Sequence, residues 1–214
     1  MSTLEHPITE VSSATAALME LIHSGRLAQA LETEQPFAAA DAYVHPNGFW
    51  KLRILGGSLE KLQVRLHYWP LGTGKGDIHD HGWAYASCAL HGSAVEDVYE
   101  EGTGSVVTAH SYAPVDGDSF TLGWTSSGTR LAHVGATIHT SGTYSGGDAS
   151  HIHTFHAKPG TDLLTVVLTG EPVVSYSRVF LPGRGSVLDK IRPVPLSPEQ
   201  IQFILVLAQT TLTA

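Results

Sequence analysis

Hydrophobic and polar residues alternate with a period of two between residues 48 and 181, which is the pattern of half-buried β-strands. Turn signals such as Gly146-Gly147-Asp148 and Pro159-Gly160 separate the alternating segments. Because the segments are short, numerous and closely spaced, they predict an all-β fold, a jelly-roll β-barrel. The expected strands are Phe49–Leu55, Leu62–Trp69, Trp83–His91, Ala94–Glu100, Val106–Ala113, Ser119–Trp124, Arg130–Thr140, Ser150–Ala157, Leu163–Thr169 and Val173–Leu181.

The N-terminal region has a helical period instead. Apolar residues spaced three and four apart predict a helix over residues 14–32, with Ser12 or Ser13 as its N-cap. Gly25 is expected to interrupt this helix, and Pro36 is expected to end the helical region.

A second helix is expected at the C-terminus, over residues 197–210. Ser197-Pro198-Glu199-Gln200 has the pattern of a capping box with proline at the first helical position, and Leu196 stands where a staple residue would. We therefore expect one domain over residues 1–214, with a helical extension (1–36), a barrel (48–181) and a C-terminal helix.

Composition and charge narrow the range of partners. The 214 residues carry a formal net charge of −8, so no basic patch is expected for nucleic acid. No apolar run approaches the ~18 residues of a membrane span, and no secretory signal opens the chain. The single cysteine, Cys88, fits a reducing compartment. We expect a cytoplasmic monomer or homodimer whose partner is a small molecule, with neither nucleic acid nor a membrane.

Thirteen histidines direct attention to a metal site. In the glycine-rich segment before Trp83, His79 and His81 are separated by one residue, so an extended strand would direct both imidazoles to the same side. Imidazole is a suitable ligand for iron, zinc, copper and nickel. The alternative interpretation is a pair of exposed loop histidines.

A later segment offers a third ligand. In Ser150-His151-Ile152-His153-Thr154-Phe155-His156, alternation places His151, His153 and Phe155 on one face and His156 on the other. A barrel site needs a ligand from a strand that is distant in sequence. We choose His153, with His151 in reserve.

The stretch from about His45 to Leu181 resembles the cupin superfamily, and within it the cysteine dioxygenase-like (thiol dioxygenase-like) cupins of the RmlC type. Ile78-His79-Asp80-His81-Gly82 is similar to the first metal motif of that group, and Ile152-His153-Thr154-Phe155 resembles the second. The resemblance implies that His79, His81 and His153 form a three-histidine set for ferrous iron.

The chain departs from the family pattern in informative places. Common cupins have a glutamate four residues after the second histidine, where this chain has Tyr85, and this favours a neutral three-histidine site. Tyr85 either directs its phenol at the metal or is an ordinary core tyrosine. Cys88 has the opposite strand parity from the two histidines and is interpreted as a core residue. The strand Leu163–Leu168 is apolar where thiol dioxygenases have polar groups, which weakens a thiol assignment.

Basic residues on two early strands are candidates for substrate binding. The likeness to thiol dioxygenases, which bind a substrate carboxylate from an early strand, suggests Lys51 and Arg53, which share one face. Arg65 and His67 share a face of the next strand, and a guanidinium facing the interior would be a fixed fork for a carboxylate. A solvated outer face is the alternative for each of them.

These observations support three hypotheses. The first is a mononuclear non-heme oxygenase that uses dioxygen on a small, anionic thiol, amino acid or keto acid, with ferrous iron as the expected metal and zinc, nickel, manganese or copper as alternatives. The second is a non-redox isomerase or lyase in which Tyr85 or His151 moves protons. The third is a small-molecule-binding protein without turnover.

Overall fold

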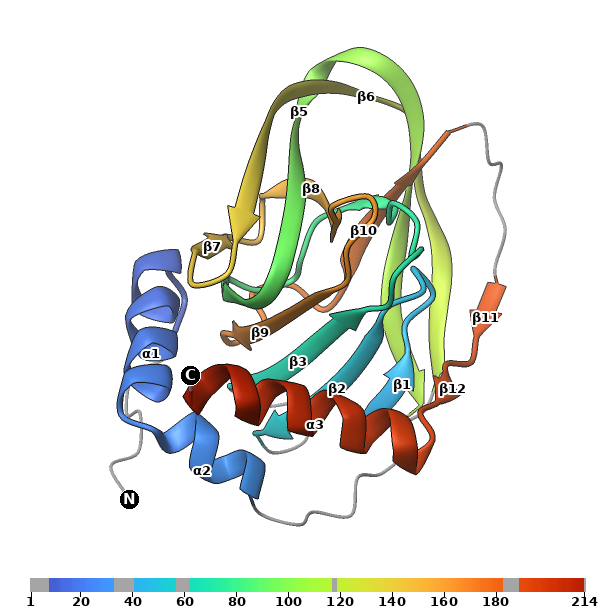
Figure 1. Ribbon diagram of the computed structural model, residues 1–214. Coiled ribbons are helices and arrows are strands. Elements are labelled where there is room, and N and C mark those ends of the chain that lie inside the picture. Colours follow the sequence, from blue (N-terminus) through green and yellow to red (C-terminus); the bar gives the residue numbers. More distant parts are fainter. Residues whose placement is uncertain (1–7, 33–40, 57–61, 117–118, 183–188, 214) are drawn as a thin grey trace.

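The computed structural model describes residues 8–32, 41–56, 62–116, 119–182 and 189–213 (Figure 1). Helices lie at the two ends, and antiparallel strands fill the region between them. The elements are α1 (Val11–His23), α2 (Arg26–Glu32), β1 (Ala42–Val44), β2 (Trp50–Leu55), β3 (Gln63–Trp69), β4 (Ile78–His79), β5 (Tyr85–Asp116), β6 (Ser119–Thr140), β7 (Tyr144–Gly147), β8 (Ile152–Ala157), β9 (Leu163–Thr169), β10 (Ser177–Leu181), β11 (Asp189–Ile191), β12 (Val194–Pro195) and α3 (Pro198–Thr213).

The strands form two sheets that share β5. Sheet A has the order β12-β1-β2-β3-β9-β5-β7, with every neighbouring pair antiparallel. Sheet B pairs β5 with β6, β8 and β10, places β4 between β8 and β10, and adds β11 beside β6. This arrangement, with helices at both ends, confirms the expected all-β jelly-roll architecture.

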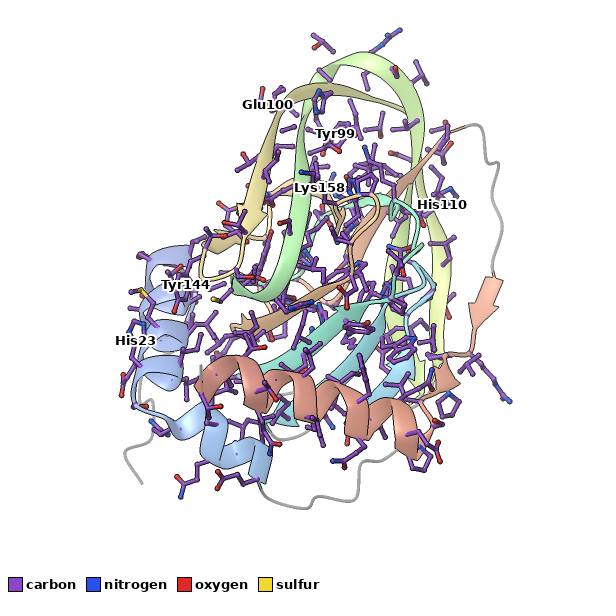
Figure 2. The ribbon with its side chains drawn as sticks, in the orientation of Figure 1. His23, Tyr99, Glu100, His110, Tyr144 and Lys158 are labelled. Carbon is purple, nitrogen blue, oxygen red and sulfur yellow. The ribbon has the colours of Figure 1, made fainter. Side chains whose placement is uncertain are left out.

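The long strand β5 joins three segments that the sequence pattern separates, and β6 joins two. Gly92 lies where β5 leaves sheet A, with φ 81°, and a Cβ there would collide with the carbonyl oxygen of Asp162. Glycine therefore lets the strand pass from one sheet to the other without a break. The β5–β6 hairpin arches over the molecule, with Tyr99 and Glu100 near its top (Figures 1 and 2).

Two further boundaries differ from expectation. Gly146 and Gly147 end strand β7 rather than forming a turn. A Cβ at Gly146 would lie 2.6 Å from the Tyr85 carbonyl oxygen, and a Cβ at Gly147 would lie 2.6 Å from the His151 side chain. These glycines allow close approach of neighbouring groups. The strand predicted from Val173 begins instead at Ser177, as β10.

The helix predictions are confirmed in part. Gly25, at φ 73°, separates α1 from α2 as expected. The predicted serine caps are wrong, because α1 begins at Val11 and its N-cap, Glu10, makes no side-chain capping bond. At α3 the capping box is present: the Ser197 N–H donates to Gln200 Oε1 (2.8 Å), and the Gln200 N–H donates to Ser197 Oγ (3.3 Å). Residues 33–36 of the predicted extension lie outside the described part of the chain.

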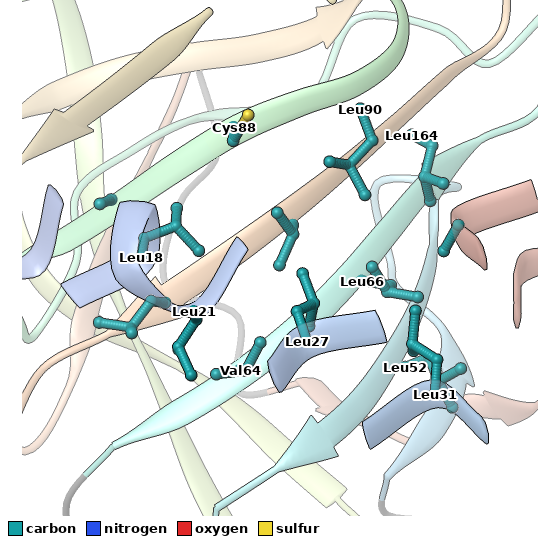
Figure 3. Close-up of a cluster of buried hydrophobic side chains, with 14 of the residues drawn as sticks. Leu18, Leu21, Leu27, Leu31, Leu52, Val64, Leu66, Cys88, Leu90 and Leu164 are labelled. Carbon is teal, nitrogen blue, oxygen red and sulfur yellow. The ribbon is translucent and has the colours of Figure 1, made fainter. Parts of the chain in front are cut away.

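The outer face of sheet A is the apolar face of the molecule. Helices α1, α2 and α3 cover it, and their side chains interlock with alternate residues of the strands (Figures 1 and 3). Leu18 and Leu27 pack there with Leu66, and each such burial contributes about 1.5–3 kcal/mol. Cys88 belongs to this cluster, which confirms its assignment to the core.

The inner face of sheet A looks across a cavity of ≈ 1250 Å³ towards sheet B. Strand register sets out its side chains in rows: Lys51 pairs with His67, which pairs with Thr165, and Arg53 pairs with Arg65 in the next row. All five residues line the cavity. The same alternation that buries leucines under the helices therefore points polar groups inward. Among the described helices, none has the length and apolarity to span a membrane.

Candidate metal centre and its cavity

Three histidines that the sequence analysis selects lie together on the sheet B side of the cavity. His79 ends β4 and pairs in register with His153 on β8, and His81 follows two residues later. One ring nitrogen from each lies within 4.8 Å of the others. The Nε2 atoms of His81 and His153 are 3.1 Å apart, close to the spacing of nitrogens that bind one ion at ~2.0–2.1 Å. The donor set therefore fits a divalent transition metal.

The far nitrogens of two of these rings are already bonded. His79 Nδ1 donates to the carbonyl oxygen of Asp77 (2.9 Å), and His153 Nδ1 donates to Glu96 Oε1 (2.7 Å). Because a carbonyl or carboxylate oxygen can only accept, both imidazoles carry their proton on Nδ1. The Nε2 lone pairs are left for a metal, which is the usual arrangement of histidine ligands and their supporting acceptors.

Burial keeps these rings neutral. It lowers the pKa of His153 to about 4, although the bond to Glu96 opposes the shift, and it lowers the pKa of His79. The pKa of His81 falls well below its ordinary value, first through burial and then because a proton on His79 or His153 would repel one on His81. Neutral imidazoles at neutral pH are ready to bind an ion without first losing a proton.

Glu96 is the supporting residue that the sequence analysis missed. It is buried on β5, and it accepts from His139 Nε2 (2.8 Å), His151 Nε2 (3.0 Å) and His153 Nδ1 (2.7 Å). Burial alone would raise the pKa of Glu96, but the three imidazole bonds outweigh it and hold the pKa well below its usual range. The available signal was an acidic residue at an inward position of a predicted strand, between Ala94 and Val98.

His151, the reserve ligand, bonds to Glu96 behind the cluster rather than joining His79 and His81. Glu96, His151 and His153 do form a second group whose ligand atoms lie within 4.8 Å. In that group, His153 and His151 both bond to Oε1 of Glu96, so the contacts between these residues are already hydrogen bonds. We therefore interpret Glu96 and His151 as support for the first group.

Tyr85 lies beside the cluster, at the start of β5. Its hydroxyl is 3.2 Å from Nδ1 and 3.5 Å from Nε2 of His153, and its ring centroid is 4.7 Å from that of His81. Burial, and then the negative charge of Glu96, raises the pKa of Tyr85 well above its ordinary value. A neutral phenol therefore lies beside the three histidines, four residues after His81.

Asp80, between the two histidines, faces the other way. Its buried carboxylate accepts from the Arg178 backbone N–H (2.5 Å) and from Arg178 Nε (2.5 Å) on β10. This pair fastens the short segment around β4 to its neighbour strand. His79 and His81 thus share a side, as the alternation predicts, although only His79 lies within a strand.

The predicted substrate residues line the same cavity, on β2 and β3, but they differ in their partners. Arg53 forms an ion pair with Asp41. Arg65 donates to Gln63 Oε1 from Nε (3.0 Å) and Nη2 (2.5 Å), and its guanidinium lies 5.3 Å from the Trp83 ring centroid. Within the described residues, neither Arg65 nor Lys51 has a carboxylate partner.

The side of the cavity formed by β2 and β3 disfavours positive charge. Burial lowers the pKa of Lys51 well below its usual value, and the charges of Arg65 and Arg53 lower it further. Burial likewise lowers the pKa of Arg65 to about 10 and that of His67 well below its ordinary value. A bound anion would relieve this repulsion, so the β2–β3 side of the cavity is suited to negatively charged ligands.

No protein-family model matches this chain, and no curated protein matches it. Similar solved structures include a cupin superfamily protein from Desulfitobacterium hafniense (11% identity, TM-score 0.37, covering 65% of this chain and 93% of that chain). An RmlC-like cupin from Ralstonia eutropha is 14% identical, with TM-score 0.37 and coverage of 75% and 80%. The DMSP lyase DddQ from Ruegeria pomeroyi is 11% identical, with TM-score 0.39 and coverage of 82% and 71%. At such low similarity, the fold assignment rests on the strand pairing and the site on its own geometry.

Proposed function

We propose that this chain is a metal-dependent enzyme of the cupin type that acts on an organic anion. One observation supports it above the others: three histidines whose ring nitrogens lie within 4.8 Å of one another and two cations without carboxylate partners among the described residues face the same cavity. Cations with a purely structural role on a half-buried surface would be paired, because removing an unpaired charge from water is costly.

His79, His81 and His153 would hold the metal, with ferrous iron as the first expectation and zinc, nickel, manganese or copper as alternatives. When bound, the ion supplies open coordination positions and Lewis acidity and, as ferrous iron, electrons for dioxygen. Glu96 fixes the tautomer and orientation of His153. Lys51 and Arg65 bind the anionic group and orient the substrate.

Oxygenase chemistry is the first reaction class, as a cysteine dioxygenase-like cupin would perform. It is supported by the neutral ligand set, since Tyr85 replaces the carboxylate that would occupy a position and cancel charge. Dioxygen and a small-molecule anion are the expected partners. The cytoplasmic location, the monomeric or dimeric state and the absence of nucleic-acid and membrane partners stay predictions.

A non-redox lyase or isomerase is the second candidate, and the position of Tyr85 favours it. A neutral phenol within 3.2 Å of a metal-ligand candidate is placed to give or take a proton beside a bound substrate. His151, bonded to Glu96, is the other candidate for proton transfer.

The test compares metals and atmospheres. Metal-free protein is loaded with ferrous iron or with zinc, metal content is measured, and each form is assayed with a panel of organic acids in air and under nitrogen. An oxygenase consumes oxygen only with iron and only when substrate is present. Turnover with zinc, or under nitrogen, would exclude the oxygenase and support the lyase or isomerase. Stoichiometric metal and ligand binding without turnover would support a binding protein.

A further inference from the structure

Aromatic rings form a continuous row along the cavity from His67, beside Lys51, to His153 in the histidine cluster. The Phe49 ring centroid lies 4.9 Å from that of His67 and 4.9 Å from that of Trp69. Trp69 lies 5.6 Å from Phe155, which lies 6.5 Å from His153. All of these rings line the cavity. A ligand that lies along this side of the cavity would therefore contact ring faces and edges.

Beside His67, this row of rings meets polar groups that have no ion-pair or hydrogen-bond partner among the described residues. The ammonium of Lys51 lies over the Tyr43 ring at 5.3 Å, and no ion pair joins it to another described residue. In the same row, His67 Nε2 is buried and bonds to no described group. Buried polar groups are nearly always satisfied in folded proteins, so an external partner is indicated here. Two cations call for an acceptor with negative charge, which a carboxylate supplies.

The size of the cavity argues against a very small ligand. Its ≈ 1250 Å³ exceeds the ~300–1,000 Å³ of pockets that hold drug-sized molecules. A three-carbon thiol or keto acid would leave most of the aromatic row against water. A planar ring would cover that surface with offset or edge contacts, which aromatic side chains favour.

We propose that the substrate is an aromatic carboxylate, with its carboxylate at Lys51 and Arg65 and its ring along Phe49, Trp69 and Phe155. This inference deepens the proposed function and depends on it for the reaction, but not for binding. Phe49, Trp69 and Phe155 then determine specificity, and the cations determine the position of the ligand.

Titration calorimetry tests the ligand class on the full chain, both metal-free and zinc-loaded so that no oxidation occurs. The probes are 2-naphthoate, its saturated analogue decahydro-2-naphthoate, the neutral 2-naphthamide, and 3-mercaptopropionate. We expect 2-naphthoate to bind at least tenfold more tightly than each of the other three. Equal or tighter binding of any of them would overturn the proposal.

Variants locate the two parts of the ligand. Lys51→Met and Arg65→Met should weaken 2-naphthoate tenfold or more and leave 2-naphthamide unchanged, while Trp69→Leu should remove the preference for the aromatic over the saturated acid. Lys158→Met is the matched control, since Lys158 is exposed and outside the cavity. The melting temperature of each ligand-free variant shows whether it folds, and Phe49→Leu replaces Trp69→Leu if the latter does not.

The failure of the two proposals can be told apart. If the chain retains no metal but metal-free protein prefers 2-naphthoate, the proposed function fails and the subsite stands. If metal binds with the expected stoichiometry but 2-naphthoate binding survives both Lys51→Met and Arg65→Met, the carboxylate lies elsewhere and the subsite is overturned.

Discussion

The histidine side and the cation side of the cavity differ in how their polar groups are paired within the protein. At the histidine side, His79 and His153 each donate to a backbone or carboxylate oxygen before any ligand is present. At the cation side, Arg53 has Asp41, but Lys51 has no acidic partner in the described chain. Hydrogen bonds within the protein fix the orientation of the histidines, whereas a cation without an acidic partner favours a ligand that carries a negative charge. The histidine cluster is thus oriented by the protein's own hydrogen bonds, and the charge on the cation side suits an anionic ligand.

The largest expected effect is loss of the metal. His79→Ala, His81→Ala and His153→Ala should each reduce bound metal from about one ion per chain to near zero, because two imidazoles seldom retain an ion through dialysis. Elemental analysis after dialysis measures this, and circular dichroism checks the fold. His23→Ala is the control, since His23 is exposed on α1 (Figure 2). Full metal content in His153→Ala, together with loss in His151→Ala, would make His151 the ligand.

A smaller effect is expected from the supporting carboxylate. Glu96→Gln should weaken metal affinity by about 10–100-fold, because the amide no longer accepts a charge-assisted bond from His153. Competition with a chelator measures the affinity, and the visible spectrum of the cobalt-loaded protein reports on the ligand geometry. Glu100→Gln is the matched control, since Glu100 is exposed on the same strand (Figure 2). Equal affinity in the two variants would reduce Glu96 to a packing role.

Acid should destabilise the metal-free protein. The pKa of His153 is lowered to about 4 in the folded state, so between its unfolded value of about 6.5 and pH 4 the unfolded chain binds more protons. Stability is therefore fully present above pH 6.5 and falls as the pH drops, by on the order of 3 kcal/mol for this residue. Urea unfolding at several pH values measures it, and His153→Gln should flatten the curve. A free energy of unfolding that rises as the pH falls would contradict the interpretation.

The smallest effect compares neighbouring cations in ligand-free protein. Arg53→Met should lower the free energy of unfolding by about 1 kcal/mol, because it leaves the Asp41 carboxylate without its partner. Lys51→Met should leave the free energy unchanged or raise it, because it removes a half-buried charge that has no carboxylate partner among the described residues. Urea denaturation of both variants gives the comparison. Greater damage from Lys51→Met than from Arg53→Met would mean that Lys51 is a structural cation.

The alternation of apolar and polar residues was sufficient for the fold class. It predicted a β-barrel, while Gly25 itself predicted the helix break and the Ser197-Pro198-Glu199-Gln200 motif predicted the capping box. It divided β5 and β6 wrongly, because a glycine such as Gly92 marks a turn in most contexts and here marks a crossing between sheets. Strand ends depend on which neighbour supplies hydrogen bonds, and a single chain segment does not contain that information.

For the site, the sequence by itself determined which residue types are available and which share a strand face. His79 and His81 follow from their spacing, and Lys51 and Arg53 from theirs. Glu96 did not follow, because a lone glutamate on a strand is usually solvated, and only the pairing of β5 with β6 and β8 brings His139, His151 and His153 to it. Likewise, only the tertiary structure shows which cation lacks a carboxylate partner, because it places Asp41 beside Arg53 and not beside Lys51. Local periodicity determines the face of the strand on which a side chain lies. The partner of that side chain, and hence its charge and its chemical role, depends on contacts between segments that are distant in sequence.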